Sequence, residues 1–372
     1  MSKNFTFYIH FERQGYRMEE QKVQPFHEVA YVHTDLDGAG CTILFRLAHL
    51  GVPEGDDTWR LFNVENSEID TLVLTHLREG RLTPDTKIIF GDICARKRTL
   101  QKLLDAGIEQ VQVLDHHKTN LSALDVYPNS IVWVPTEEGE PLESGTSVMY
   151  QYYNRLYDKE HGNMFPFSDN GATGTLLKEF VELVRLYDTY EWKKDNKREA
   201  KQLQVLFQLL GMERFTKKYV ARFSHLNDLP DGVVYPMISA EDMEFVSRRI
   251  EMEEKSIEDF SEDDIYAISY QGKLGALVLN TRGANINELA NSFLTKHPKY
   301  DFLVGFDLSG SAGFSFRSTK DNIDLGRDFA GKIGGGGHPK AAGAIAKPEL
   351  VDHIVDILYD YLSEHGRVPY GT

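Results

Sequence analysis

The sequence predicts an α/β fold in which a parallel sheet forms the core of a first domain and a smaller α/β domain follows. The first observation is that short apolar runs, typical of buried strands, alternate with helix-like segments. The second is that these runs end directly in Asp or His, at the edge of such a sheet where chemistry gathers. The third is a change of character near Asp263, where a second group of strand-like runs begins.

In the first domain, three apolar runs are expected to be strands. They are EVAYVH from Glu28, KIIFGDI from Lys87 and QVQVLDHH from Gln110. Helix-like stretches separate them and then dominate residues 174 to 260. The expected helices are Cys41–Leu50, Lys97–Gly107, Thr175–Tyr187 and Met243–Phe260. This alternation favours a parallel sheet with helices on both faces.

The second domain combines strand-like and helix-like runs within residues 262–372. The expected strands are IYAISY, GALVLN, DFLVGFDL and GFSFRS, and the expected helices are Asn287–Lys296 and Pro348–His365. The chain of 372 residues is long enough for two such domains. We therefore assign residues 1–28 to an extension of unknown role, 29–240 to the first domain with a helical tail, and 241–261 to a connecting helix.

Composition excludes several classes of protein. With only Cys41 and Cys94 there is no disulfide framework. No apolar run approaches the ~20 residues that cross a membrane, and the N-terminus is a poor secretory signal. We therefore expect a cytoplasmic protein without membrane contact. The net charge of −16 disfavours binding to long duplex DNA, whereas a local basic pocket could still hold one small phosphorylated ligand.

The first polar cluster, His33-Thr-Asp35-Leu-Asp37-Gly38, follows a predicted strand. Alternate residues of an extended chain share a face, so His33, Asp35 and Asp37 could point the same way and bind a metal ion. The alternative is a polar turn that ends in Asp37-Gly38.

Two further clusters follow the next two predicted strands. Asp92 ends KIIFG, and by itself it could equally be the N-cap of a following helix. The sequence Asp115-His116-His117 follows VQVL, and two adjacent histidines beside an Asp are hard to explain by packing. One His could bind metal while the other contacts substrate or a supporting carboxylate. The alternative is an exposed polar loop.

Asp188 ends a helix-like run, where a negative charge opposes the helix dipole and suggests a role beyond structure. Mixed Asp and His ligands suit a divalent ion such as Mn²⁺, with Mg²⁺, Co²⁺ or Zn²⁺ as alternatives. Six candidate ligands exceed what one catalytic ion needs. Two ions about 3.5–4 Å apart, bridged by one carboxylate, would use them.

The second domain carries a glycine-rich segment from Gly334 to Gly343. Four successive glycines expose backbone N–H groups that could hold an anion, and a following helix would offer its N-terminus to a phosphate. The alternative is a flexible hinge, although His338 and Lys340 directly after the glycines favour a ligand site. Upstream, Arg317 in GFSFRS suits bidentate phosphate contact, or else faces solvent.

Together and in this order, these motifs resemble the DHH phosphoesterase family, and within it the NrnB-type oligoribonucleases (nanoRNases). Asp115-His116-His117 matches the motif that names the family, and the Gly334–Gly343 segment resembles the GGGH signature of the DHH-associated C-terminal domain. HTDLDGAG, DHHKTN, ESGTSVMY and RLYDTYEW also resemble that branch. Many relatives have His-x-x-x-Asp-x-Asp where this chain has His-x-Asp-x-Asp.

The resemblance implies a DHH catalytic domain, a smaller DHH-associated domain that binds substrate, and an active site in the cleft between them. It implies a centre of two Mn²⁺-type ions with Asp92 as the bridge. The implied metal ligands are His33, Asp35, Asp37, Asp92, His116 and Asp188. The implied catalytic residues are His117 and Asp115. The implied substrate-binding residues are Ser315, Arg317, Gly334, Gly335, Gly336, Gly337 and His338.

The expected activity is two-metal hydrolysis of short oligonucleotides, about two to five nucleotides long, to mononucleotides. A 3′-phosphoadenosine-5′-phosphate (pAp) phosphatase and a phosphodiesterase of linear or cyclic dinucleotides would use the same centre and remain open. A RecJ-like exonuclease on long strands and a family II pyrophosphatase fit less well. A catalytically silent nucleotide-binding regulator is the alternative from another class. The sequence leaves cleavage direction and oligomeric state open, a homodimer included.

Overall fold

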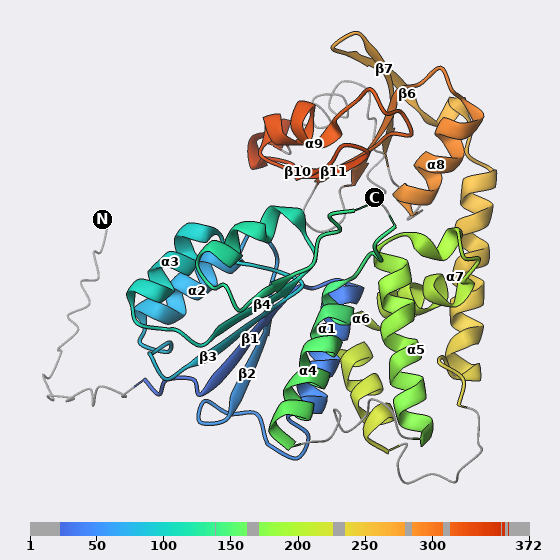
Figure 1. Ribbon diagram of the computed structural model, residues 1–372. Helices are drawn as coiled ribbons and strands as arrows, with labels where there is room; N and C mark the ends of the chain where they lie inside the picture. The colour runs from blue at the N-terminus through green and yellow to red at the C-terminus, as the bar shows by residue number, and fades with distance from the viewer. Residues whose placement is uncertain are drawn as a thin grey trace, which may run out of the picture. The chain divides into compact units, whose positions relative to one another are not determined.

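The computed structural model describes residues 23–137, 139–161, 171–225, 235–279, 285–307 and 313–350, together with 352–353 and 356. The chain divides into two compact units, Met1–Met243 and Glu244–Thr372, each described here by itself (Figure 1).

The first unit is built on a parallel sheet of five strands in the order β2-β1-β3-β4-β5. The strands are β1 (Glu28–Val32), β2 (Trp59–Asn63), β3 (Lys87–Gly91), β4 (Val111–Asp115) and β5 (Ile131–Val132). The strands predicted at β1, β3 and β4 are thus confirmed. Since β2 and β3 lie on opposite sides of β1, the strand order reverses between β1 and β3. Ligands of open α/β sheets bind outside the carboxyl ends of the strands at such a point.

Helices cover both faces of this sheet, as predicted. The helices of this unit are α1 (Leu36–Ala48), α2 (Ile69–Arg78), α3 (Lys97–Asp105), α4 (Gly145–His161), α5 (Gly171–Asp188) and α6 (Arg198–His225). In Figure 1, α2 and α3 lie on one face and α1 and α4 on the other. Helix α1 also packs against α5 and α6. The helix α7 (Ala240–Glu258) contains the boundary between the units.

The core under α2 and α3 follows from the alternation of residues along the strands. Val29 and Tyr31 of β1 point into it beside Phe90 of β3, and they pack against Val73 of α2 and Leu100 of α3. Burial of each such side chain stabilises the folded state by about 1.5–3 kcal/mol. The sheet is therefore a rigid support for the residues that follow its strands.

Helix α1 begins five residues earlier than the sequence predicted. Asp35 is its N-cap and accepts a hydrogen bond from the Gly38 N–H at 2.9 Å. The glycines in the first turns hid this start, because glycine is a poor helix former. The expectation that His33, Asp35 and Asp37 share one face of an extended chain is therefore wrong, since Asp37 is already helical.

The second unit contains a six-stranded sheet in the order β10-β11-β9-β8-β7-β6, in which only the β7–β8 pair is parallel. The strands are β6 (Tyr266–Tyr270), β7 (Lys273–Leu279), β8 (Phe302–Asp307), β9 (Gly313–Arg317), β10 (Gly336–His338) and β11 (Ala341–Ile345). The four predicted strands match β6 to β9.

Each face of this sheet has its own apolar cluster. Helix α8 (Ile286–Lys296) packs Leu289 and Phe293 against one face, and its predicted bounds are confirmed within one residue. Against the other face lie Leu325 of the short helix α9 (Leu325–Asp328) and the nearby Phe329. A mixed α/β second domain, as predicted, is therefore present.

The prediction of a helix after the glycine run is wrong, because the segment forms a hairpin. Gly336 pairs with Gly343 across β10 and β11, and β11 pairs in turn with β9. The close approach of backbones requires glycine: a Cβ on Gly335 would lie 2.1 Å from the Gly343 carbonyl oxygen. The backbone N–H groups of β11 are therefore used for pairing with β10 and β9. The edge strand is β10, and its outer backbone groups have no neighbouring strand among the described residues.

Two predicted segments, the N-terminal extension and the C-terminal helix, cannot be compared in full. Most of the N-terminal extension and most of the helix expected at Pro348–His365 lie outside the described residues. Within the described ranges, no helix combines the length and the apolar character that a membrane span requires.

Candidate metal centre

The carboxyl ends of β1, β3 and β4 carry the side chains that the sequence singled out. His33 follows β1, Asp92 follows β3 and His116 follows β4, while Asp188 is the last residue of α5. His116 Nε2 lies 3.4 Å from Asp92 Oδ1 and 3.3 Å from Asp188 Oδ2. Residues that are far apart in sequence therefore meet at the edge of the sheet where a ligand is expected.

Asp37, in the first turn of α1, is buried and held by the N-terminus of α4. Its carboxylate accepts the Gly145 N–H at 2.6 Å and the Thr146 N–H at 2.8 Å. A Cβ on Gly145 would lie 2.5 Å from the Asp92 Cβ, so glycine is needed there. The N-terminus of α4, the positive end of the helix dipole, thereby faces the Asp37 carboxylate. His116 Nε2 lies 3.7 Å from Asp37 Oδ2.

Asp92 lies at the centre of the cluster in a strained backbone conformation. Its φ of 57° belongs to the left-handed region, which costs a non-glycine residue of order 1 kcal/mol and is often found at functional sites. The side chain is buried, and neither carboxylate oxygen has a hydrogen-bond partner among the described residues. The alternative role as a helix cap is not realised, because Arg96 is the N-cap of α3.

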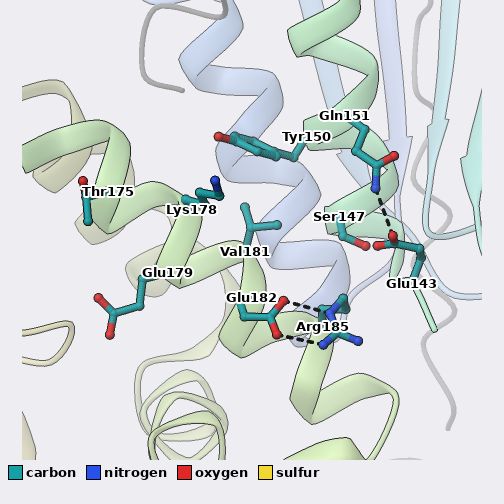
Figure 2. A pocket seen from close by; sticks show the side chains of 10 residues that line it. All are labelled: Glu143, Ser147, Tyr150, Gln151, Thr175, Lys178, Glu179, Val181, Glu182 and Arg185. Carbon is teal, nitrogen blue, oxygen red and sulfur yellow. Dashed lines mark hydrogen bonds and ion pairs between the residues drawn. The ribbon is translucent and has the colours of Figure 1, made fainter. Parts of the chain in front are cut away.

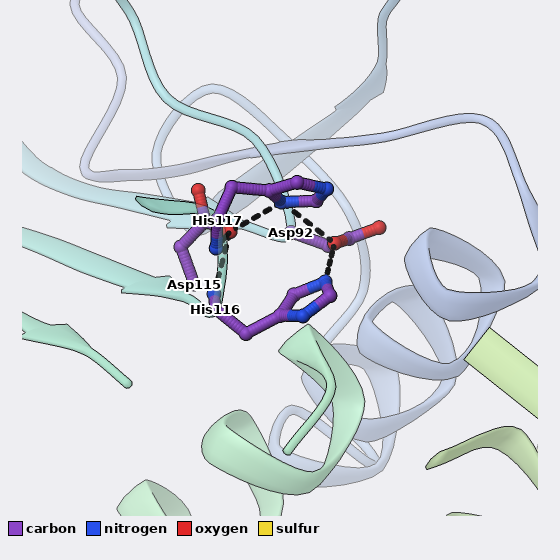
Figure 3. A group of neighbouring side chains, drawn as sticks. All are labelled: Asp92, Asp115, His116 and His117. Atoms are coloured by element: carbon purple, nitrogen blue, oxygen red, sulfur yellow. Dashed lines mark hydrogen bonds and ion pairs between the residues drawn. The ribbon is translucent and has the colours of Figure 1, made fainter. Parts of the chain in front are cut away.

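Asp115 and His117 are joined by a hydrogen bond within the group of side chains drawn in Figure 3. Asp115 Oδ1 accepts hydrogen bonds from the backbone N–H groups of His116 and His117 and from His117 Nδ1, at 2.6, 3.0 and 2.8 Å. Its Oδ2 accepts from Asn120 Nδ2 at 2.5 Å. Because a carboxylate only accepts, the proton of His117 is on Nδ1. The His117 side chain is 41% exposed, so its Nε2 edge can be reached from solvent.

Three overlapping groups of the described residues have the composition and spacing to hold metal ions. They are His33, Asp35 and Asp92; Asp37, His116 and Asp188; and Asp92, Asp115, His116 and His117. In each group the candidate ligand atoms lie within 4.8 Å of one another. Asp92 and His116 each belong to two groups. All six predicted metal ligands therefore lie in one cluster, which consists of these two triads: His33, Asp35 and Asp92, and Asp37, His116 and Asp188.

The unpaired polar atoms support a cation in this position. His33 Nδ1, both oxygens of Asp92 and His116 Nε2 are buried and have no hydrogen bond of acceptable geometry within the described chain, although His33 Nδ1 lies 3.0 Å from Asp35 Oδ2. Buried polar groups are normally satisfied, so four unsatisfied atoms in one cluster call for an explanation. A divalent cation would satisfy all four, and a mixed carboxylate–imidazole set suits Mn²⁺ and similar ions.

Electrostatics lead to the same interpretation. Burial, followed by repulsion from Asp37, raises the pKa of Asp188 to about 7, and similar causes raise the pKa of Asp92 well above its ordinary value. Burial works to lower the pKa of His33, but the Asp35 and Asp92 carboxylates overcome it and raise the pKa to about 11. Without a cation, Asp188, Asp92 and His33 therefore hold their protons more tightly than they would in water. Metal ions would compete with these protons.

Sequence reasoning missed several residues that support the cluster. Gly145 and Thr146 hold the Asp37 carboxylate only through backbone N–H groups, which leave no signal in side-chain chemistry. Glu65 and Asn66 lie at the other ring nitrogen of His33, with Nε2 3.7 Å from Glu65 Oε2 and 3.4 Å from Asn66 Nδ2. An acidic residue after β2 could have drawn attention, because metal-binding histidines usually contact a carboxylate or amide through their second nitrogen.

The residues predicted to bind substrate lie in the second unit. Ser315 and Arg317 are on β9, opposite Gly343 and Ala341 of β11. The Arg317 guanidinium donates to Asn287 Oδ1 and to the carbonyl oxygens of Phe316 and Ala342. Gly334 and Gly335 precede the edge strand β10, which contains Gly336, Gly337 and His338.

Comparison with known proteins relates the chain to one domain family and to a bacterial nuclease. The DHHA1 domain family model matches residues 264–364. Over 335 residues the chain is 30% identical to the oligoribonuclease NrnB of Bacillus subtilis (strain 168), covering 87% of this chain and 74% of that relative.

Among solved structures, the exonuclease RecJ bound to manganese is 18% identical with a TM-score of 0.52, covering 92% of this chain and 90% of that one. RecJ of Thermus thermophilus in complex with Mn²⁺ is also 18% identical with a TM-score of 0.51, covering 91% of this chain and 52% of that one. At this level of identity, both structures establish the fold.

Proposed function

Because the chain belongs to the DHH phosphoesterase family and carries its DHHA1 domain, we propose that it hydrolyses phosphodiester bonds of short oligonucleotides. The relative from Bacillus subtilis is named an oligoribonuclease, and this supports an oligonucleotide as the substrate. The net charge of −16 favours a short substrate over a long polyanion, about two to five nucleotides.

The observation that carries the proposal is the set of unsatisfied atoms around Asp92. Two divalent ions would be held by the two triads, His33–Asp35–Asp92 and Asp37–His116–Asp188. Asp92 would help to hold both ions, since both of its oxygens lack partners among the described residues and it lies near both His33 and His116. The manganese named in the RecJ structures supports Mn²⁺ as the ion, with Mg²⁺ or Co²⁺ as alternatives. Such ions would neutralise phosphate charge and lower the pKa of water.

The chain's own groups complete the site. His117 would meet the scissile phosphate with its exposed Nε2 edge, while its Nδ1–H donates to Asp115. The Asp115 carboxylate accepts hydrogen bonds from His117 at both its backbone N–H and its Nδ1, so its proposed contribution is to position His117. Arg317 and the Gly334–His338 segment bind the distal part of the nucleotide. Arg317 is preorganised for this by three hydrogen bonds that fix its guanidinium plane.

A product ladder tests the function. Incubation of the purified chain with an end-labelled RNA 5-mer and Mn²⁺ should shorten it stepwise to mononucleotides. Parallel reactions would contain pAp, a linear dinucleotide and a cyclic dinucleotide. The matched variants are Asp92→Asn, expected to be inactive, and Asp125→Asn, expected to be active because the Lys97–Asp125 pair is exposed and contributes about 0–1 kcal/mol.

The other outcomes separate the rival functions. Turnover of pAp with an intact 5-mer would replace the proposal with a phosphatase, and turnover of cyclic dinucleotide alone would replace it with a cyclic dinucleotide phosphodiesterase. Tight nucleotide binding without any product at saturating Mn²⁺ would indicate a regulator.

A further inference from the structure

Arg185 lies on α5, one turn before Asp188, and its guanidinium contacts three parts of the chain. Nε and Nη2 bind the Glu182 carboxylate at 2.8 and 2.7 Å, and Nη1 binds Glu191 Oε2 at 2.5 Å. Nη1 also donates to the Leu142 carbonyl oxygen at 2.8 Å. The Arg185 side chain is 15% exposed, so these contacts are less screened than those of a surface pair.

The contact with Glu182 stays within α5 and orients the guanidinium (Figure 2). The two residues line a groove of about 560 Å³ together with Ser147 and Gln151 of α4. Glu182 is half-exposed, and exposed pairs on one helix stabilise little by themselves. The other two contacts matter more, because they connect Arg185 to segments outside its helix.

The first of these segments is the turn that follows Asp188. Tyr190 adopts the left-handed conformation with a φ of 63°, which turns the chain back so that Glu191 meets Arg185. The Thr189 hydroxyl donates to the Arg185 carbonyl oxygen at 2.8 Å and closes the same turn. The strain at Tyr190 is offset by these contacts. The position of Asp188 is thus fixed from both sides.

The second segment is the approach to α4. Leu142, whose carbonyl oxygen Arg185 binds, lies three residues before Gly145. The N–H groups of Gly145 and Thr146 hold the Asp37 carboxylate. Arg185 therefore connects the segment that carries Asp188 to the segment that holds Asp37.

These two carboxylates flank His116 Nε2 at 3.3 Å (Asp188) and 3.7 Å (Asp37). We propose that Arg185 is a positioning residue that sets the spacing of Asp37 and Asp188, and thereby the affinity of this triad for a divalent cation. The inference rests on the metal centre of the proposed function and adds to it a residue that touches neither ion nor substrate. A residue that supports ligands in this way typically changes metal affinity or activity by about 10–100-fold.

The experiment measures Mn²⁺ binding to the full-length, metal-stripped chain by titration calorimetry. Arg185→Met should weaken binding to one of the two proposed sites by about 10–100-fold, and raised Mn²⁺ should restore kcat with little change in KM. Arg185→Lys should fall in between, because an ammonium keeps the charge without the planar fork. The control Lys178→Met removes an exposed cation from the same helix and groove and should bind Mn²⁺ like the wild type.

Unfolding curves separate this role from a purely structural one. If Arg185→Met lowers the Tm but binds Mn²⁺ with wild-type affinity, the proposal is wrong. Should Arg185→Met not fold, Glu191→Gln provides the second test, since it breaks the same link from the other side and should weaken Mn²⁺ binding while the helix stays intact. A wild type that binds Mn²⁺ but cleaves no oligonucleotide would refute the function and leave this inference standing. A wild type that binds no Mn²⁺ would refute the inference.

Discussion

The imidazole Nε2 of His116 lies 3.4 Å from Oδ1 of Asp92, yet the two buried atoms make no acceptable hydrogen bond. The residues follow different strands of one sheet, and Asp92 holds a strained backbone to reach this position. Two unsatisfied groups at this distance are costly unless something lies between or beside them. A cation held by both groups, as proposed, would satisfy them.

This relationship predicts the outcome of Asp92→Asn. The amide keeps the size of the carboxylate but removes the charge and one acceptor, so the His33–Asp35–Asp92 triad loses a ligand, and the group that Asp92 forms with His116 is weakened. We expect Mn²⁺ binding to fall by at least about 100-fold and turnover of a dinucleotide to fall below detection. The measurements are calorimetry and a steady-state assay.

The stability of the same variant provides the control. Because burial and repulsion from Asp37 raise the pKa of Asp92 and so favour its neutral form, the neutral amide should leave the unfolding temperature of the metal-free protein close to that of the metal-free wild type. A fully active variant would exclude Asp92 as a ligand. Loss of activity with a strongly lowered Tm would point to a structural role instead.

How far the sequence predicted this site depends on the kind of contact. The approach of Asp92 and His116 was predictable because both follow buried strands, whose carboxyl ends meet at one edge of a parallel sheet. The place of Asp188 was indicated by its position at the end of a helix. The arrangement of Asp35 and Asp37 was not, because the cap at Asp35 starts a helix through glycines that normally disfavour one.

In the second unit, the strands could be predicted from the sequence, whereas the structure of the glycine segment could not. Its strands were visible as apolar runs, but the glycine segment was expected to precede a helix and instead pairs as β10 and β11. The pairing depends on the close approach of Gly335 to Gly343, a tertiary contact that local patterns do not encode. The roles of the supporting groups around Asp37 were equally hidden, since backbone amides carry them.

The Asp115→Asn variant tests whether Asp115 holds the His117 side chain in place. Asp115 accepts from three donors at Oδ1, and the pKa of its carboxyl is lowered, since the His117 contacts outweigh the effect of burial. An amide in this place is a weaker acceptor and allows His117 to turn. We expect kcat for a dinucleotide to fall by about 10–100-fold with KM little changed.

Asn120→Ala is the matched control, because it removes only the contact to Oδ2. Its kcat should stay within about tenfold of the wild type, in line with one lost hydrogen bond of about 1 kcal/mol. Equal losses in both variants would mean that the carboxylate acts on the loop as a whole rather than on His117.

The pair Gly335→Ala and Gly336→Ala separates folding from binding in the glycine segment. A Cβ on Gly335 would lie 2.1 Å from the Gly343 carbonyl oxygen, whereas a Cβ on Gly336 would meet no atom within 4 Å. Gly335→Ala should therefore destabilise the protein by about 1–3 kcal/mol or more, as overpacking does, and lower the Tm. Gly336→Ala should leave the Tm unchanged.

The same pair tests the proposed substrate contact. If the outer edge of β10 binds the nucleotide, Gly336→Ala should raise KM for a dinucleotide several-fold without a change in Mn²⁺ affinity. Unchanged KM would remove this position from the substrate-binding surface, and an equal fall of Tm in both variants would contradict the geometry of the hairpin.

The protonation of the metal-free cluster predicts how stability depends on pH. The pKa of Asp188 is raised to about 7 and that of His33 to about 11, so the folded protein binds more protons than the unfolded chain. The resulting stabilisation is complete below the ordinary pKa values of 3.8 and 6.5, and it is lost as pH rises through the folded-state values. In EDTA the Tm should therefore fall between about pH 5 and pH 8.5, as measured by calorimetry at fixed ionic strength.

Mn²⁺ should reverse this trend, because it competes with the same protons and binds better as they leave. The increase in Tm that Mn²⁺ produces should grow from about pH 5.5 to pH 8. Asp188→Asn is the control, since it removes the titration between about pH 4 and pH 7 and should flatten the EDTA profile there. Other groups contribute to the absolute slope, so the difference between wild type and variant is the decisive quantity. An increase in Tm with Mn²⁺ that is independent of pH would show that the ion does not displace protons from these residues, and the centre would have to lie elsewhere.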